Sequence, residues 1–496
     1  MLVPQEQAER LVDLVLTLVK KVAIKAHEYI GNHDRIRGYR KYPVLSNTFS
    51  KDDPEFDEIN KSVPFLIYDI PRYELKDYPE DSIQYGAIFN GYGNDRINVA
   101  DIDGFNVLCQ FVVGSDELTR AFWGDNANTD SEFRIKIMIT EIVERYLFCT
   151  QATKDVPANL EEKIRPYVAE KLIRYIYDSL EIDIYVPICL ATFQDEIIKL
   201  SDNIEIIRIP DAIQKARREA CQYEAYSQEN VAACATHMIA LHGYSFKNEE
   251  YFSINAATRN YNAYPLYDID IIMAMIRIVT GYSIGYEQIL SKPIGWIDDF
   301  CADLIPLYGA KIHCVNAKEY DKNWLQLPVG YVNSEQAQDI QNLYSTVKSF
   351  DANKTNEKLF FAIKRLNRCM LRDENDDMAI DATIGLEALL SGGTKGEITY
   401  TISNRIPVVF KHEPSTIYKL NECRAIMKKI YKYRSTMVHG GTLKPVDKVY
   451  TIDGIDVEID KVAVDFLRYT LLFVIHNPEY LDAKKIDEFI DSKMLN

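Results

Sequence analysis

The last third of the chain is dominated by amphipathic segments with helical periodicity. From Ser334 onwards, apolar residues recur every three or four positions, and Gly, Pro or Ser residues separate one periodic segment from the next. The predicted helices cover residues 334–350, 356–372, 374–390, 398–412, 415–439 and 462–476, with Ser334 as the cap of the first. Residues 448–459 predict a β-hairpin before the last helix. Because such helices bury their apolar stripes against one another, the sequence predicts a helical bundle over residues 335–496.

The first 330 residues combine helical and strand patterns. In residues 1–180, a mixed α/β region, we expect an amphipathic first helix, further helices at 133–150 and 160–180, and short strands at 63–70, 88–99 and 104–114. In a second strand-containing region, residues 181–330, we expect strands at 182–193, 204–210 and 235–246, whereas 267–282 and 294–308 fit helix or strand. The predicted fold class is α+β: a strand-rich N-terminal region followed by an all-α C-terminal bundle.

Charge and cysteine usage narrow the function classes. The first helix is interrupted by charged residues and therefore does not resemble a signal peptide, and no apolar run approaches the ~18 residues of a membrane span. The nine cysteines are scattered without a CxxC pair, which indicates reduced thiols. We therefore expect a soluble, cytoplasmic protein without a cofactor or a metal. A net charge of −17 argues against coating of nucleic acid, but residues 395–448 hold eleven Lys and Arg against four Asp and Glu.

This basic segment contains a short motif suited to phosphodiester chemistry, Tyr433-Arg434-Ser435-Thr436-Met437-Val438-His439-Gly440-Gly441. Arg434 offers a planar, permanently charged fork for phosphate oxygens. His439 titrates near neutrality and can take a proton from a ribose 2′-hydroxyl. Gly440 and Gly441 should end the helix, which places His439 in its last turn.

The spacing of the motif raises a geometric requirement. Residues five apart on a helix lie roughly 140° apart, so Arg434 and His439 do not share one face, and a symmetric dimer would bring two copies together. Spacing alone has low specificity, because Arg405 also precedes His412 by seven residues. We discount that pair because Pro407 interrupts the segment and no helix-ending glycine follows.

Several segments together resemble the ApeA-like branch of the HEPN superfamily. They are Leu386-Glu387-Ala388-Leu389-Leu390, Ile402-Ser403-Asn404-Arg405, and the Tyr431-to-Gly440 segment with Arg434, Ser435 and His439. The resemblance covers about residues 335–478, and it implies a metal-independent, RNA-cleaving effector, often in bacterial anti-phage defence, abortive infection or toxin modules. It departs from many HEPN nucleases in one place, because Ser435 stands where Asn, Asp or His often follows the arginine.

The resemblance also implies roles for individual residues. Arg434 and His439 would be catalytic, and they would cut RNA, tRNA being one candidate, by 2′-hydroxyl attack to leave a 2′,3′-cyclic phosphate. Asp377, Ser435 and Glu387 are the supporting candidates, with Asp377 expected to orient Arg434. The candidate RNA contacts are Arg424, Lys428, Lys429 and Lys432. The protein would act as a homodimer through the HEPN domain, and residues 1–330 would meet a phage-derived trigger or a regulatory partner.

Other assignments stay open beside this one. The helical domain could be a non-catalytic HEPN module that dimerises and binds a partner, or an RNA-binding protein that never cuts. Asp101 with Asp103, and Asp268 with Asp270, would share a face if they lay on strands, but neither pair has a third metal ligand at a suggestive spacing. His237 and His242 bracket an apolar run and are interpreted as partly buried strand residues.

Overall fold

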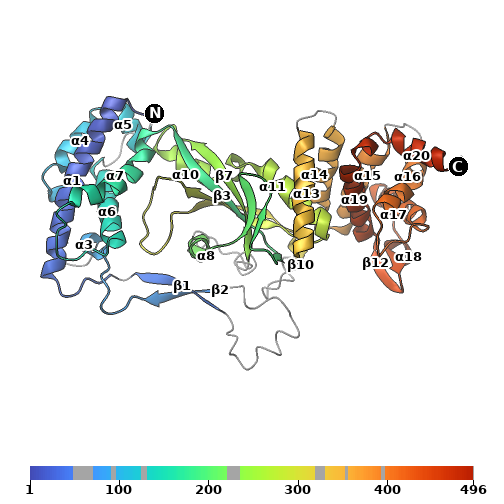
Figure 1. The fold of residues 1–496 in the computed structure, drawn as a ribbon, viewed down its shortest axis with the longest axis horizontal. Helices are drawn as coiled ribbons and strands as arrows, with labels where there is room; N and C mark the ends of the chain where they lie inside the picture. The colour runs from blue at the N-terminus through green and yellow to red at the C-terminus, as the bar shows by residue number, and fades with distance from the viewer. Residues whose placement is uncertain are drawn as a thin grey trace, which may run out of the picture.

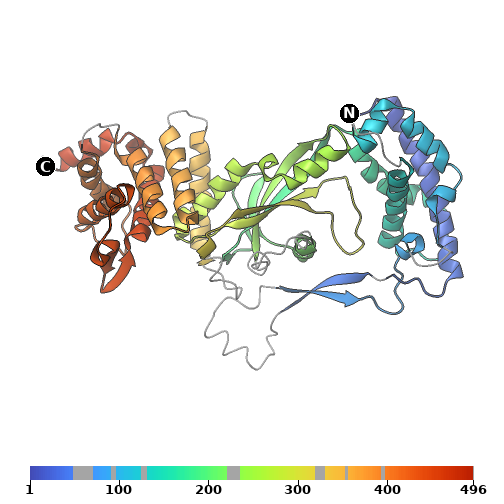
Figure 2. The ribbon, with the colours of Figure 1, turned by 180° about the vertical axis from the view of Figure 1, so that it is seen from behind.

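The protein is an elongated α+β molecule with a central sheet between two groups of helices (Figure 1). The computed structural model describes residues 1–38, 40–47, 71–90, 96–124, 131–219, 235–318, 330–351, 356–392 and 397–494. The N-terminal helices lie at one end and the C-terminal helices at the other, as the view from behind also shows (Figure 2). No helix of these residues is both long and apolar enough to cross a membrane.

The N-terminal part is mainly helical, with its own apolar core. Its helices are α1 (Gln5–Asn32), α3 (Ala87–Asn90), α4 (Phe105–Val113), α5 (Asp116–Trp123), α6 (Ser131–Cys149) and α7 (Leu160–Ile176), with a 3-10 turn, η1 (Val99–Asp101). They bury a continuous set of side chains from Val3 to Ile176 that includes most of the apolar stripe of α1. One antiparallel hairpin, β1 (Lys41–Asn47) and β2 (Pro71–Asp77), extends from these helices along the central part (Figure 1).

The strands predicted at residues 88–99 and 104–114 are wrong. Residues 87–90 are helical, 99–101 form a 3-10 turn, and the second run forms helix α4, which buries Leu108, Cys109 and Val112. Gly104 and Gly114 bound this run, and a short apolar segment between turn residues fits either helix or strand. Here a helix is the conformation that turns these side chains into the N-terminal core. The strand predicted at 63–70 lies outside the described residues.

The central part is built on an antiparallel sheet of six strands in the order β5-β6-β7-β3-β8-β9. The strands are β3 (Ser179–Pro187), β5 (Ile197–Lys199), β6 (Ile204–Arg208), β7 (His237–Lys247), β8 (Tyr286–Pro293) and β9 (Tyr308–Cys314). The predicted strands at 182–193, 204–210 and 235–246 are confirmed, the first as β3 and the short β4 (Ala191–Phe193), which pairs in parallel with β10 (Gly330–Val332).

Helices cover this sheet, and a loop from it reaches the N-terminal helices. Helix α11 (Leu266–Thr280) packs into the core on one face of the sheet. On the other face, Ile213 of α8 (Asp211–Glu219) packs with Tyr185. Helices α10 (Tyr251–Arg259) and η2 (Tyr261–Ala263) precede α11 in the chain. Residues 267–282 are therefore helix, and 294–307 form the loop between β8 and β9. Asp298 of that loop forms an ion pair with Arg174 of α7 and accepts a hydrogen bond from Lys171 at its backbone oxygen.

The C-terminal part consists of helices and one hairpin. The elements are α13 (Ser334–Asp351), α14 (Glu357–Leu371), α15 (Asn375–Leu390), α16 (Ile398–His412), α17 (Cys423–Val438), α18 (Pro445–Lys448), β11 (Val449–Ile452), β12 (Ile455–Glu458), α19 (Ile459–His476), η4 (Pro478–Leu481) and α20 (Lys484–Met494). The hairpin prediction is confirmed, with Asp453 and Gly454 at positive φ in its two-residue turn.

Two predicted helix starts need correction. The helix expected from residue 415 begins at Cys423, because the Ser415 hydroxyl accepts the N–H groups of Ile417 and Tyr418 and holds a turn instead. The cap of α13 is Asn333 and not Ser334: Asn333 and Gln336 exchange side chain to backbone hydrogen bonds of 2.9 and 3.1 Å.

The sheet and the C-terminal helices share one apolar core, which extends from Leu180 to Ile486. Arg277 of α11 lies at their junction and is fully buried. It donates to the carbonyl oxygen of Ile284, before β8, and over 2.7 Å to Oδ1 of Asn367 on α14. Asn367 in turn donates to the carbonyl oxygen of Asp270 over 2.8 Å. A single guanidinium therefore satisfies two acceptors, one before β8 and one on α14, and Asn367 extends the network back to α11.

Replacing this guanidinium by an apolar side chain should weaken the junction. In Arg277→Met, the oxygens of Ile284 and Asn367 lose their donor in a dry environment, so the free energy of unfolding should fall by about 2–4 kcal/mol. Urea denaturation followed by circular dichroism measures this change. Arg259→Met, at the exposed end of α10, is the matched control and should change it by less than about 0.5 kcal/mol. Equal stability of the two variants would contradict a structural role for Arg277.

Candidate functional site at the end of helix α17

Helix α17 ends where the sequence predicts, at the glycine pair. Gly440 has a φ of 67°, and its N–H donates to the carbonyl oxygen of Met437 over 3.1 Å. The N–H of Gly441 donates to the carbonyl oxygen of Thr436 over 2.8 Å. These two bonds form a Schellman motif, in which the left-handed residue is normally glycine. His439 is the capping residue before it, and its imidazole is exposed to solvent.

Arg434 lies on another side of α17, as its five-residue separation from His439 requires. Arg434 is half-buried, and its Nε is buried without a hydrogen-bond partner in the described part of the chain. No ion pair joins Arg434 to a carboxylate among these residues, and none of their hydrogen bonds joins it to His439. One chain therefore places the two predicted catalytic side chains near the same helix end without bringing them into contact.

Two tyrosines of the motif contact acids on α15. The hydroxyl of Tyr431 donates to Oε1 of Glu387 over 3.0 Å, and the hydroxyl of Tyr433 donates to Oδ1 of Asp376 over 2.6 Å. Burial raises the pKa of Tyr431, and the Glu387 carboxylate raises it further, whereas the nearby Arg434 guanidinium lowers it. Burial is also the main cause that raises the pKa of Tyr433. Both phenols therefore stay protonated and act as donors.

The three supporting residues are placed unequally. Glu387 reaches the Arg434 side of α17 through Tyr431. Asp377, which we expected to orient Arg434, instead lies 3.7 Å from the guanidinium of Arg372. Ser435 is exposed, and its backbone carbonyl oxygen accepts the N–H of His439 over 3.2 Å. Glu387 is thus linked to the surroundings of Arg434 through Tyr431, whereas Asp377 pairs with Arg372.

The four candidate RNA contacts also differ in their surroundings. Arg424 is exposed and lies over the Tyr400 ring, and Lys428 is exposed without a described ion-pair partner. Lys429 donates to the backbone oxygens of Val446 and Val449, so it holds α18 and β11 against α17. Lys432 forms a 2.8 Å ion pair with Asp447. Arg424 and Lys428 remain available to a ligand, whereas Lys429 and Lys432 have structural partners.

Sequence reasoning included Tyr431 and Tyr433 in the motif without assigning them a role, and it did not identify Asp460. Asp460 is buried in the first turn of α19, where burial raises its pKa to about 6, and its Oδ2 has no hydrogen-bond partner in the described chain. Its charge contributes to the raised pKa of Tyr433. The two tyrosines flank Lys432 beside Arg434. Because a buried phenol normally donates a hydrogen bond, two of them so close together predict acceptors on a neighbouring helix.

The competing pair of Arg405 and His412 is structural, but not because Pro407 interrupts the helix. Helix α16 continues through Pro407. Arg405 is buried and donates to both carboxylate oxygens of Asp487 and to the carbonyl oxygen of Leu390. His412 lies among the rings of Phe473, Tyr480 and Phe489. Neither side chain is presented to a ligand.

The remaining titratable candidates are dispersed. Asp101 lies in a 3-10 turn, and Asp103 pairs with Lys21 over 2.6 Å. Asp268 and Asp270 lie on helix α11 and therefore do not share a face. His237 is fully buried on β7, whereas His242 contacts Asp183 over 2.8 Å. In the part of the chain that the structure describes, no cluster of three or more His, Cys, Asp or Glu side chains has the geometry of a metal site.

Comparison of the chain with protein-family models, with curated proteins and with solved structures finds no match.

Substitution of Gly440 tests the geometry of the helix end. Gly440→Ala should lower the free energy of unfolding by about 1–2 kcal/mol, because a Cβ in the left-handed conformation clashes with the following carbonyl oxygen. No heavy atom lies within 4 Å of that Cβ, so packing adds nothing to this cost. Gly440→Asn is the control, because asparagine tolerates the conformation and should recover part of the loss. Thermal unfolding measures both variants, and an unaltered Gly440→Ala would contradict the left-handed cap.

Proposed function

We propose that residues 335–496 form an HEPN domain and that the protein is a metal-independent endoribonuclease of the ApeA-like class. The observation that carries this proposal is the end of α17: an Arg434 guanidinium without a described carboxylate partner, and an exposed His439 held by a Schellman motif. A phosphate binder and a titratable group are the two elements that metal-free RNA cleavage requires. Residues 395–448 supply the local positive charge that an acidic chain needs to receive RNA.

The chemistry assigned to these groups is transesterification. His439 takes the proton of a ribose 2′-hydroxyl, and the 2′-oxygen attacks the adjacent phosphorus. The P–O5′ bond then breaks, and the departing 5′-oxygen receives a proton from a second imidazole. Arg434 stabilises the charge that develops on the phosphoryl oxygens. The products are a 2′,3′-cyclic phosphate and a 5′-hydroxyl.

A second copy of the chain supplies the second imidazole in this proposal. Arg434 and His439 of one copy point away from a common centre, so a site that uses both must draw on two copies. Apolar side chains are exposed on the last turn of α17 and on α18, which follows it: Val438 by 48% and Val446 by 67%. A two-fold interface along this part of α17 would cover both residues.

Residues 1–330 then regulate the nuclease or select its RNA. The apolar core that joins the central sheet to the C-terminal helices supports this assignment, because a change in the sheet acts directly on α14 and α19. In the proposed role, a phage-derived trigger or a regulatory partner binds the N-terminal region, and cleavage of cytoplasmic RNA, such as tRNA, arrests growth of the infected cell.

Cleavage of total RNA in the presence of EDTA tests the proposal. Wild type should cut, and Arg434→Ala and His439→Ala should each lose at least ~10²-fold in rate, because each removes a group that acts on the reacting phosphate. Arg368→Ala and His476→Ala are the matched controls within the C-terminal part and should retain full activity. Cutting should leave products that end in a cyclic phosphate, which alkaline or enzymatic opening of the ring detects.

The same assay separates the rival functions. A chain that binds RNA through Arg434 but never cuts would leave the RNA intact throughout. Its Arg434→Ala variant would retain RNA more weakly, whereas His439→Ala would retain RNA as well as wild type. A partner-binding module would neither cut nor retain RNA. Growth arrest on expression, with and without His439→Ala, extends the test to a trigger present in the cell.

The free and the structurally paired lysines of α17 should differ in their effect on RNA affinity. In the His439→Ala background, Lys428→Ala should weaken RNA binding several-fold and reduce the slope of log K against log salt by about one, because one phosphate contact is lost. Lys432→Ala should have a smaller effect, because Asp447 already neutralises that charge. Filter binding at several salt concentrations measures both. An equal loss in the two variants would contradict this order.

A further inference from the structure

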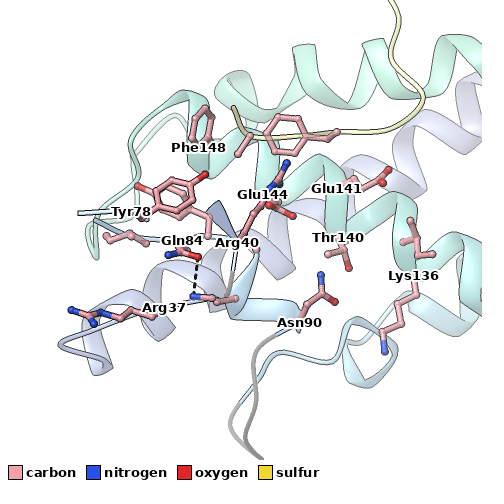
Figure 3. Close-up of a pocket in the computed structure, with 18 of the residues that line it drawn as sticks. Arg37, Arg40, Tyr78, Gln84, Asn90, Lys136, Thr140, Glu141, Glu144 and Phe148 are labelled. Carbon is pink, nitrogen blue, oxygen red and sulfur yellow. Dashed lines mark hydrogen bonds between the residues drawn. The ribbon is translucent and has the colours of Figure 1, made fainter. Parts of the chain in front are cut away.

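A cavity of about 1150 Å³ lies in the N-terminal part of the molecule (Figure 3). Helix α6, which lines it, is far from α17 (Figure 1). Helix α6 forms one wall, and α3 with the preceding segment forms another. The base of the β1–β2 hairpin contributes Arg40 and Tyr78, and the loop between β8 and β9 contributes Phe300. The volume exceeds the ~300–1,000 Å³ of most small-molecule pockets. It can therefore hold a ligand of nucleotide size with its bound water.

The sequence of α6 provides a second, non-core stripe for this cavity. One side of the helix is buried in the N-terminal core. The opposite side presents Phe133, Ile137, Thr140, Glu144 and Phe148 to the cavity, at intervals of three or four residues. Phe133 and Ile137 are exposed apolar side chains on this stripe. A helix that presents both apolar and polar groups to a cavity has the composition of a ligand-binding wall.

Glu144 is the central polar group of the wall. Its carboxyl has no hydrogen-bond or ion-pair partner in the described residues, and it lies against the backbone of Gly86, where a Cβ would approach its Oε1 to 2.6 Å. Burial raises the pKa of Glu144 to about 7, although the Arg40 guanidinium lowers it, and Glu141 and Asp303 raise it further. At neutral pH this group can therefore donate or accept a hydrogen bond.

Cationic and aromatic groups complete the cavity. Lys136 has no described ion-pair partner, whereas Glu141, the other acid of the wall, is paired with Lys171. Arg37 lies on the opposite side of the cavity in Figure 3 and donates to the backbone oxygen of Glu80 over 3.1 Å. The rings of Phe148 and Phe300 lie 6.1 Å apart in an edge-to-face arrangement, and Tyr78 adds a third ring from the hairpin.

We propose that this cavity binds a nucleotide. The base packs against the aromatic rings, its polar edge meets Glu144 and Thr140, and the phosphate lies at the rim on Lys136. An anionic ligand needs such a local cation, because the chain as a whole carries a charge of −17. A purely apolar ligand would leave Glu144 without a partner, and inorganic phosphate alone would leave the rings uncovered. The site is built by the N-terminal part and the 300–302 loop, so it does not depend on the ribonuclease proposal.

Isothermal titration calorimetry of the full chain with AMP, GMP, CMP and UMP tests this assignment. At least one of them should bind. Lys136→Ala should weaken that binding at least tenfold, because it removes the phosphate contact. Glu144→Leu should do the same, because it removes the contact to the base edge. Leucine in place of a half-buried carboxyl without a described partner should not lower the melting temperature, and the measured melting temperature then separates loss of binding from unfolding. Lys163→Ala on α7 and Glu28→Gln on α1, both exposed and outside the cavity, are the matched controls.

Four results would overturn the proposal. The first is no heat of binding with any of the four nucleotides at millimolar concentration. The second is binding that Lys136→Ala and Glu144→Leu leave unchanged, and the third is inorganic phosphate that binds as tightly as the nucleotides. Binding that Arg434→Ala abolishes would place the site on α17 and would also contradict the assignment. Nucleotide binding that persists in an inactive Arg434→Ala chain would support it whatever the outcome of the cleavage assay.

Discussion

From Ile271 to Ile276, helix α11 is apolar around its whole circumference, and the arrangement of the central and C-terminal parts follows from the need to cover these turns. All six consecutive residues from Ile271 to Ile276 are buried. A sheet can cover only one side of a helix, so other elements must cover the opposite side. The sheet covers one side, and α13, α14 and α19 cover the other. The cost of this burial is the charge of Arg277, which Ile284 and Asn367 satisfy. The C-terminal helices are therefore anchored to the sheet and do not form an independent bundle beside it.

The sequence predicts those elements whose pattern is long and whose ends carry a local signal. The helix end at Gly440 and the hairpin turn at Asp453 and Gly454 are of this kind, because both need positive φ angles that few residues adopt. Residues 105–113 are the counterexample: a nine-residue apolar run has no length to distinguish helix from strand, and only packing against the N-terminal core decides it. The shared core of sheet and helices could not be read from periodicity either, because it depends on which apolar faces meet.

At the candidate site, the sequence identifies the charged groups but not their partners. Arg434 and His439 are visible as a motif, and the structure places them as the helical period requires. The partner of Asp377 is Arg372, five residues earlier in the chain, and this local contact takes precedence over the longer one we expected. Two other acids of α15 accept hydrogen bonds from tyrosines of α17: Glu387 from Tyr431, and Asp376 from Tyr433. Such pairings depend on how α15 and α17 cross, and no spacing within either helix contains that information.

These pairings bear on how α17 keeps its positive charge. An acid that formed a direct ion pair with Arg434 would neutralise the guanidinium and fix it away from a ligand. On α15, Glu387 accepts a hydrogen bond from the phenol of Tyr431 instead, and burial keeps that phenol protonated. The acid therefore stabilises the contact between two helices while the Arg434 guanidinium stays without a described carboxylate. An anionic ligand at α17 is therefore attracted by a guanidinium that no described carboxylate neutralises. This local attraction opposes the repulsion from a chain whose net charge is −17.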